Sequence, residues 1–420
     1  MAKNERILLK KGTATFNLVG RAKVSDFTFK IDVESSREDS DWVYNQMNLG
    51  VDCGIYGTIY GDMMSGYGTD RDNVLKVHGK KENGQDDFES KFTIDWEDRF
   101  DEDIIKTVGE MQIITVGLEK DDKGKTVYKK FLSQYDAIKY IEEHLESDMV
   151  VNVKGNLQYS IYNENVQVKK DITSIVLSKA EEKDFKATFT QALLLDGDSI
   201  GKPDKETNTV PITGYVIDYF SKKYGDKSII HKVNGKVING LNLPVVKTFD
   251  FVIGEDKEQA KRMLKVFKVK GKKITQLVVD GYFTKGEVNT VTVSEADIPD
   301  DIKELIDLGY VDKDEILGQI ALKNGGKKPE KMVIKSPHIK YVGEEGSKMP
   351  MMDKTEDIYE EDNISIQLIL DSLEIDNNLD QDDNTEDSDK EASQDDLDKA
   401  LDNEDKADDD GDNDDWLNDL

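Results

Sequence analysis

A single cysteine, Cys53, occurs in 420 residues, so the chain cannot form a disulfide framework and its cysteine usage is typical of a reducing cytoplasm. No apolar run approaches the roughly 18 residues that a membrane helix needs. The segment from Met1 to Lys10 also lacks the apolar stretch of a signal peptide. These absences predict a cytoplasmic protein without a membrane partner.

The sequence also lacks a recognisable catalytic or metal-binding constellation. Its 4 histidines are far apart, and none has a second His or Cys at ligand spacing. The segment Gly197 to Pro203 imitates a phosphate loop, but it is one residue short and has Pro where Ser or Thr would bind magnesium. Carboxylates are too abundant for any pair to be singled out for acid–base chemistry. We therefore expect no catalytic residues, no metal, no cofactor and no enzymatic activity.

The acidic charge is concentrated at the C-terminus. The whole chain has a net charge of −31, and residues 344–420 hold 31 acids against 5 Lys, which leaves only −5 for residues 1–343. Such a block repels itself and has too few apolar groups to offset the entropy of ordering, so we predict a disordered tail over 344–420. Its apolar tip, Trp416, Leu417 and Leu420, is predicted to bind partner proteins. The apolar segment Ile364 to Leu373 is predicted to form a short helix that docks on the body or on a partner.

The body shows the same order of signals twice, over residues 1–179 and 184–343. Each half opens with Ala-Thr-Phe, at Ala14 and at Ala187, and continues with a strand that contains glycine, Val51 to Tyr60 and Val210 to Phe220. Glycine inside a strand is typical of the bends that a curled barrel needs.

One helix per half then follows, between Ser133 and Glu146 and between Glu255 and Lys268, where apolar residues recur at helical spacing. Further strands end each half, and their predicted ranges are Val150–Leu157, Val166–Lys169, Leu277–Phe283 and Val288–Val293. Short helices over Ile298–Leu308 and Asp314–Leu322 and a last strand near Met332–Tyr341 would complete the body.

Strands, one helix and then a hairpin is the order of a five-stranded oligonucleotide-binding (OB) barrel. The sequence therefore predicts a mostly β fold with a few helices (α+β), namely two tandem OB-like barrels followed by the acidic tail. A different mixed α+β pair of domains is the alternative.

Aromatic residues lie on the segments that an OB barrel uses to bind its ligand, where they can stack on bases without sequence preference. Strands also favour aromatic residues for their cores, and half of the positions on a strand face inward. The candidate ring residues for binding nucleic acid are Trp42, Tyr44, Tyr56, Tyr60, Tyr67, Tyr159, Tyr162, Tyr215, Tyr219, Tyr224, Tyr282 and Phe283.

Positive charge is concentrated between Ser221 and Lys285, where 15 Lys or Arg face 6 acids. A groove that follows a phosphate backbone needs such a segment, and its affinity should fall with added salt. A solvated helix face would explain part of the same pattern. The first half has a net charge of −7, so we expect it to bind mainly by stacking. The candidate cations are Lys222, Lys223, Lys261, Arg262, Lys270, Lys272 and Lys273.

In this architecture and in its acidic tail with an apolar tip, over Asp408 to Leu420, the chain resembles the OB-fold single-stranded DNA-binding proteins of bacteria and phages. The resemblance implies a sequence-nonspecific protein of DNA replication, recombination or repair, whose tail competes for the DNA groove and recruits replication and recombination proteins. Bacterial members have one OB domain per chain and a tip ending in Ile-Pro-Phe. This chain departs from both features, which favours a phage-type monomer or dimer in the host cytoplasm.

Two other functions are compatible with the same residues. An OB-fold structural or assembly protein would make protein–protein contacts and show no salt-sensitive affinity for DNA. An acidic DNA mimic would bind a DNA-handling protein and no DNA.

Overall fold

The computed structural model describes residues 7–37, 40–163, 165–233, 236–254, 256–285, 303, 330–343 and 347–373. The strand predicted at Val288–Val293, the helices predicted at Ile298–Leu308 and Asp314–Leu322, and the tip at Trp416, Leu417 and Leu420 lie outside these residues. Among the residues described, no helix is both long and apolar enough to span a membrane.

Five strands of the first half close into a barrel. In ring order, β1 pairs with β3, β3 with β4, β4 in parallel with β10, β10 with β9, and β9 again with β1. This order, with a parallel closing pair and a helix after the third strand, is that of an OB barrel. Its elements are β1 (Ala14–Lys23), β3 (Trp42–Asp52), β4 (Thr58–Gly68), α2 (Gln134–His144), β9 (Val150–Tyr162) and β10 (Asn165–Leu177).

The pairings of the second half close a ring in the same order. Here β11 pairs with β12, β12 with β17, β17 in parallel with β19, β19 with β18, and β18 with β11. The elements are β11 (Lys186–Leu195), β12 (Thr209–Phe220), β17 (Leu241–Val252), α3 (Lys257–Phe267), β18 (Lys273–Lys285) and β19 (Glu330–Pro337). The predicted mostly β class and the five-stranded barrel are confirmed.

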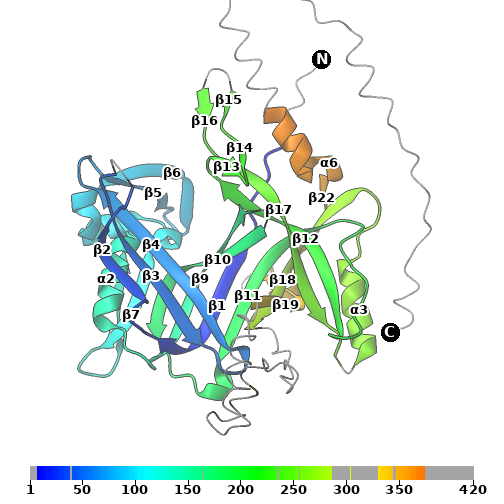
Figure 1. The fold of residues 1–420 in the computed structure, drawn as a ribbon, viewed down its shortest axis with the longest axis horizontal. Helices are drawn as coiled ribbons and strands as arrows, with labels where there is room; N and C mark the ends of the chain where they lie inside the picture. Colours follow the sequence, from blue (N-terminus) through cyan, green and yellow to red (C-terminus); the bar gives the residue numbers. More distant parts are fainter. Residues whose placement is uncertain are drawn as a thin grey trace, which may run out of the picture.

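The first strands of the two rings, β1 and β11, pair with each other in an antiparallel ladder in which Phe16 lies opposite Phe189. One continuous sheet therefore passes from the first ring into the second, as Figure 1 shows at the centre of the molecule. One hydrophobic core cluster likewise includes residues of both rings, such as Leu18 and Phe249. Backbone hydrogen bonds between β1 and β11 thus join the two halves. The division of the body into two domains near residue 180 stays a prediction.

Local signals explain where the two long helices begin. The Ser133 side chain accepts a hydrogen bond from the Tyr135 N–H and caps α2, as predicted, while the Asp256 side chain caps α3 through the Gln259 N–H. Each helix packs its apolar side on its own ring, through Ile138 and Ile141 in α2 and through Leu264 and Phe267 in α3.

The remaining elements are insertions and edges. Between β4 and α2, a hairpin and a short helix form a small core of their own around Val108, and a further strand pair flanks β10. Two short hairpins form an arm between β12 and β17, at the top of Figure 1. These elements are β2 (Phe29–Glu34), β5 (Val74–Lys80), β6 (Asp86–Asp95), α1 (Glu102–Thr107), β7 (Ile114–Lys120), β8 (Thr126–Phe131), β13 (Lys223–Tyr224), β14 (Lys227–Ser228), β15 (His231–Val233) and β16 (Lys236–Ile238).

Three predictions about the elements are wrong. The segment Val51 to Tyr60 is not one strand, because a 3-10 turn over Gly54–Tyr56 separates β3 from β4. The turn needs glycines, since Gly54 and Gly57 have φ values of 65° and 78°, which other residues rarely adopt. The strand that closes the second ring is β19, not Val288–Val293.

The third wrong prediction is the start of the tail at residue 344. Residues beyond it form β21 (Met349–Met352), which pairs with β20 (Ile339–Val342), then β22 (Lys354–Glu360), which pairs with β18, and α6 (Glu361–Ile364). Residues 366–373 are helical, and Ile369, Leu370 and Leu373 are buried in the main core. The apolar segment Ile364 to Leu373 thus docks on the body, because burial of its side chains outweighs the acidity around it.

Candidate nucleic-acid interface

Three aromatic residues project from the outer face of β3 and β4. Antiparallel pairing places Trp42 opposite Gly68, Tyr44 opposite Gly66, and Tyr60 opposite Gly50. Residues that face each other across such a pair point to the same side of the sheet, and the alternate residues Met47, Leu49 and Ile59 are buried inside the ring. We call Trp42, Tyr44 and Tyr60 the ring platform.

The glycines let the rings of the platform lie close to the sheet. A Cβ atom at Gly50 would lie 3.0 Å from Cε1 of Tyr60, and one at Gly66 would lie 2.9 Å from Cε2 of Trp42. Because Gly50 and Gly66 have no side chains, the Tyr60 ring can lie on β3 and the Trp42 ring on β4. Tyr60 keeps 50% of its surface exposed, whereas Trp42 and Tyr44 are half-buried.

Two cations lie over rings of the platform. The Arg71 guanidinium carbon is 5.8 Å from the Trp42 ring centroid, and the Lys285 ammonium nitrogen is 5.0 Å from the Tyr60 ring centroid. Arg71 also forms an ion pair of 3.3 Å with Asp41, and Asp62 forms one of 3.0 Å with Lys169. The platform can therefore stack on flat apolar groups, with Lys285 and the paired Arg71 beside it.

The corresponding face of the second ring, on β12 and β17, carries two tyrosines. Tyr219 is 57% exposed, and its hydroxyl donates to the Asn239 carbonyl at 3.0 Å. Tyr215 lies opposite Val246 and is half-buried, and its pKa is raised by burial and by the nearby Asp196 carboxylate. Tyr219 is therefore the accessible tyrosine of this face, at the base of the arm.

Tyr56 and Tyr282 meet at the junction of the two rings, with their ring centroids 5.5 Å apart. Lys285, at the end of β18, completes this junction, because it reaches from the second ring to Tyr60 of the first. Sequence reasoning missed Lys285, and it could not have been found by local pattern because its partner is 225 positions earlier in the chain. Arg71 was missed because a loop arginine carries no signal of its own.

Two candidate ring residues are wrong. Tyr159 is 4% exposed, and its hydroxyl donates to Gln191 at 2.8 Å. Phe283 is fully buried, and its ring contacts the Phe189 ring and the Lys170 ammonium. Both occupy inward positions of their strands, and a base cannot reach either ring.

Three other candidates are separated from the platform. Tyr67 points to the opposite side of β4 from Gly66, where it contacts Trp96 and Tyr135 at centroid distances of 5.5 and 5.3 Å. Tyr224 packs on the core and donates its hydroxyl to the Pro244 carbonyl at 2.7 Å. Tyr162 is 68% exposed at the tip of the β9–β10 hairpin.

The candidate cations fall into two groups, neither of which lies on β3 or β4. Lys222 and Lys223 are exposed at the base of the arm. The others lie on α3 or just after it, and α3 is on the opposite side of the molecule from β3 and β4 (Figure 1). These others are Lys261, Arg262, Lys270, Lys272 and Lys273, of which Lys273 forms an ion pair with Glu360. The cations carried by α3 are therefore not part of the face that holds the ring platform.

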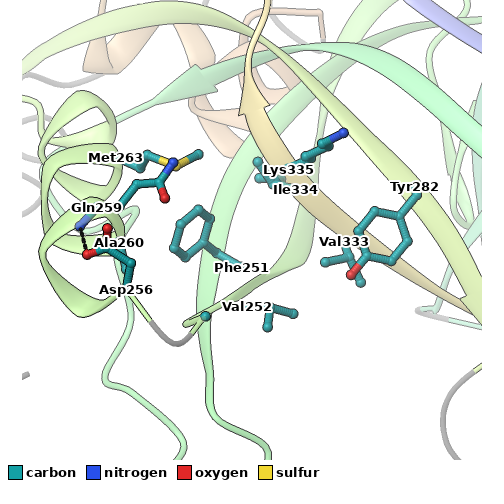
Figure 2. A pocket seen from close by; sticks show the side chains of 11 residues that line it. Phe251, Val252, Asp256, Gln259, Ala260, Met263, Tyr282, Val333, Ile334 and Lys335 are labelled. Carbon is teal, nitrogen blue, oxygen red and sulfur yellow. Dashed lines mark hydrogen bonds between the residues drawn. The ribbon is translucent and has the colours of Figure 1, made fainter.

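A cavity of about 370 Å³ lies between α3 and the strands β17, β18 and β19. Figure 2 shows Met263 and Ala260 of α3 on one wall, with Val333 of β19 and Tyr282 of β18 on the other. Its lining is apolar apart from Asp256, Gln259 and Lys335, and the Asp256 carboxylate is already engaged in capping α3. The cavity thus offers shape and apolar surface but no cluster of reactive groups.

Comparison with known proteins gives a family and distant structural likenesses. No curated protein matches the chain in sequence. A crystal structure of a deletion mutant of the single-stranded DNA-binding protein from Thermus aquaticus aligns with 65% of this chain and 88% of its own, at 10% identity and a TM-score of 0.25. So distant a likeness leaves the function to be argued from the site. The model of the YorF family matches residues 71–292, which is just over half of the chain. The chain therefore belongs to the YorF family.

Proposed function

We propose that this protein binds single-stranded DNA without sequence preference, by stacking bases on the ring platform. The observation that supports this most is the set of three aromatic–glycine pairs on one outer face of β3 and β4. Every base has a flat face, so rings that lie open on a sheet bind any sequence. This face corresponds to the second and third strands of an OB barrel, which is where such barrels bind oligonucleotides.

Electrostatics has a smaller role than in a groove lined by lysines. Arg71 and Lys285 are the cations that contact the platform, and Asp62 neutralises Lys169 beside it. We therefore expect binding that depends strongly on rings and moderately on salt. The exposed Lys222, Lys223 and Tyr219 at the base of the arm would extend the contact onto the second ring.

The acidic residues after position 373 would compete with DNA for these cations. The apolar tip would bind replication or recombination proteins. Removing residues 374–420 while keeping the docked helix should tighten binding of DNA at low salt, because a tethered polyanion is lost. Equal or weaker binding by this truncated protein would contradict the competition.

The main test is a titration with oligo-dT at two salt concentrations, followed by tryptophan and tyrosine fluorescence. Single replacement of Trp42, Tyr44 or Tyr60 by Ala should each cost about 1–3 kcal/mol of binding free energy. Tyr128→Ala is the matched control, because Tyr128 is 62% exposed on β8 and lies outside the platform. A mixed-sequence strand should bind like oligo-dT. If the wild-type protein does not bind oligo-dT even in dilute buffer, the proposed function is wrong.

A further inference from the structure

The junction between the two rings places a tyrosine of one ring under a lysine of the other. One face of the Tyr60 ring lies over Gly50 of β3, and the Lys285 ammonium stands 5.0 Å from the ring centroid. The aliphatic part of Lys285 runs along the β3–β4 turn, since a Cβ atom at Gly57 would lie 3.5 Å from Cβ of Lys285. The lysine is thus held by its stem, while its charged end is supported by the ring alone among the described contacts.

Other contacts also join the two rings of strands at this junction, and they hold Tyr60 and Lys285 next to each other. Tyr56 and Tyr282 pack together next to them, with their ring centroids 5.5 Å apart. Lys170 of β10, buried to 5% exposure, forms an ion pair of 2.5 Å with Glu330 of β19. The β1–β11 ladder joins the same two rings through backbone hydrogen bonds.

We propose that Tyr60 and Lys285 form one nucleotide subsite that requires both rings of strands, an inference that rests on the proposed function. A base stacks on the exposed surface of Tyr60 and displaces the ammonium from the ring. Because its stem stays anchored on the turn, Lys285 then contacts the phosphate of the same nucleotide. The strand consequently passes from the first ring to the second at this point, and neither ring alone forms the complete binding surface.

The test compares Tyr60→Ala, Lys285→Met and the double variant in oligo-dT titrations across a range of salt concentrations. Lys285→Met should lower the slope of log affinity against log salt by about 0.7, the value for one phosphate contact on a single strand. Tyr60→Ala should weaken binding by about tenfold. The double variant should bind within about twofold of Tyr60→Ala alone, because without the ring no nucleotide is held at the lysine.

Lys270→Met is the matched control, since Lys270 is an exposed lysine in the segment that follows α3. It should leave the salt slope unchanged, and an equal fall in slope for Lys270→Met would overturn the subsite in favour of general charge. Thermal unfolding distinguishes a structural role of Lys285 from a binding role. If Lys285 only held the two rings of strands together, Lys285→Met would lower the melting temperature without changing the salt slope.

The subsite and the proposed function can fail separately. If wild-type protein binds oligo-dT and Trp42→Ala weakens it, but Lys285→Met leaves the slope unchanged, the subsite is wrong and the function stands. Independent effects that multiply in the double variant would also overturn the subsite. If wild-type protein does not bind at all, both are wrong.

Discussion

Phe16 and Phe189 lie directly opposite each other in the antiparallel ladder between β1 and β11. Each belongs to an Ala-Thr-Phe segment and each faces a glycine on its other neighbour, Phe16 facing Gly155 of β9 and Phe189 facing Gly281 of β18. The two rings of strands are therefore joined through equivalent residues of their first strands. A local two-fold axis passes between the two phenylalanines.

The glycines opposite these phenylalanines should be intolerant of a side chain. A Cβ atom at Gly281 would lie 2.2 Å from Cζ of Phe189 and 2.4 Å from the Val333 carbonyl oxygen. Gly281→Ala should therefore lower the free energy of unfolding by about 1–3 kcal/mol, because ring and backbone must both move. Urea denaturation measures this, with Gly197→Ala as the control, since a Cβ atom there meets nothing within 4 Å. Equal stability of the two variants would contradict the packing described.

The ion pair between the rings should show strong coupling in a double-mutant cycle. Glu330→Gln removes the carboxylate that faces buried Lys170 and also the charge that favours protonation of Lys247, whose pKa is already lowered by burial. We expect a loss of about 3 kcal/mol of unfolding free energy for Glu330→Gln. Replacing both Lys170 and Glu330 by Met should recover most of that loss, because no unpaired charge is left buried. Additive losses in the double variant would rule out this coupling.

The thiol of Cys53 should be inert in the folded protein. Cys53 is fully buried, and burial, with the nearby Asp52 carboxylate, raises the pKa of its thiol to about 12. The thiolate is the reactive form, so the folded protein should not react with a thiol reagent at pH 8, whereas the unfolded protein should react at the rate of an ordinary cysteine. Fast labelling of the native protein would mean that the β3–β4 turn opens.

Two truncations should separate the docked helix from the residues that follow it. A chain ending at Leu373 should keep the melting temperature of the full chain, because the buried side chains of Ile364, Ile369, Leu370 and Leu373 are retained. A chain ending at Glu360 loses all four, each of which contributes about 1.5–3 kcal/mol when fully buried, so it should melt far lower or fail to fold. Similar melting of the two truncated chains would show that the helix does not stabilise the body.

Much of the fold could be predicted from the sequence because its signals are local. Ser133 and the spacing of Ala137, Ile138 and Ile141 predict α2, and glycine within strands predicts the curvature of a barrel. A strand near Met332–Tyr341 was predicted, but not its role as the closing strand of the second ring, since Val288–Val293 is rich in β-branched residues and lies nearer in sequence. The parallel pairing of β19 with β17 joins segments far apart in the sequence, so no local pattern predicts it.

The site was predictable only in part, for a different reason. Strand alternation separates outward from inward positions once the register is known, and it assigns Tyr44 and Tyr60 to one face. Tyr159 and Phe283 look the same in sequence but point inward. Cations of α3 were grouped with the rings because they are near in sequence to β17 and β18, whereas the helix carries them to the end of the second ring.

The ladder between β1 and β11 also determines what would happen to either half produced separately. A first half without residues 184–420 would leave the β1 edge from Ala14 to Val19 with unpaired N–H and C=O groups. Because Phe16 sits on the two-fold axis, β1 of another molecule can occupy the place of β11 in the same register. Such a fragment would form a symmetric homodimer through this edge, and the natural two-ring chain corresponds to that dimer with its subunits fused.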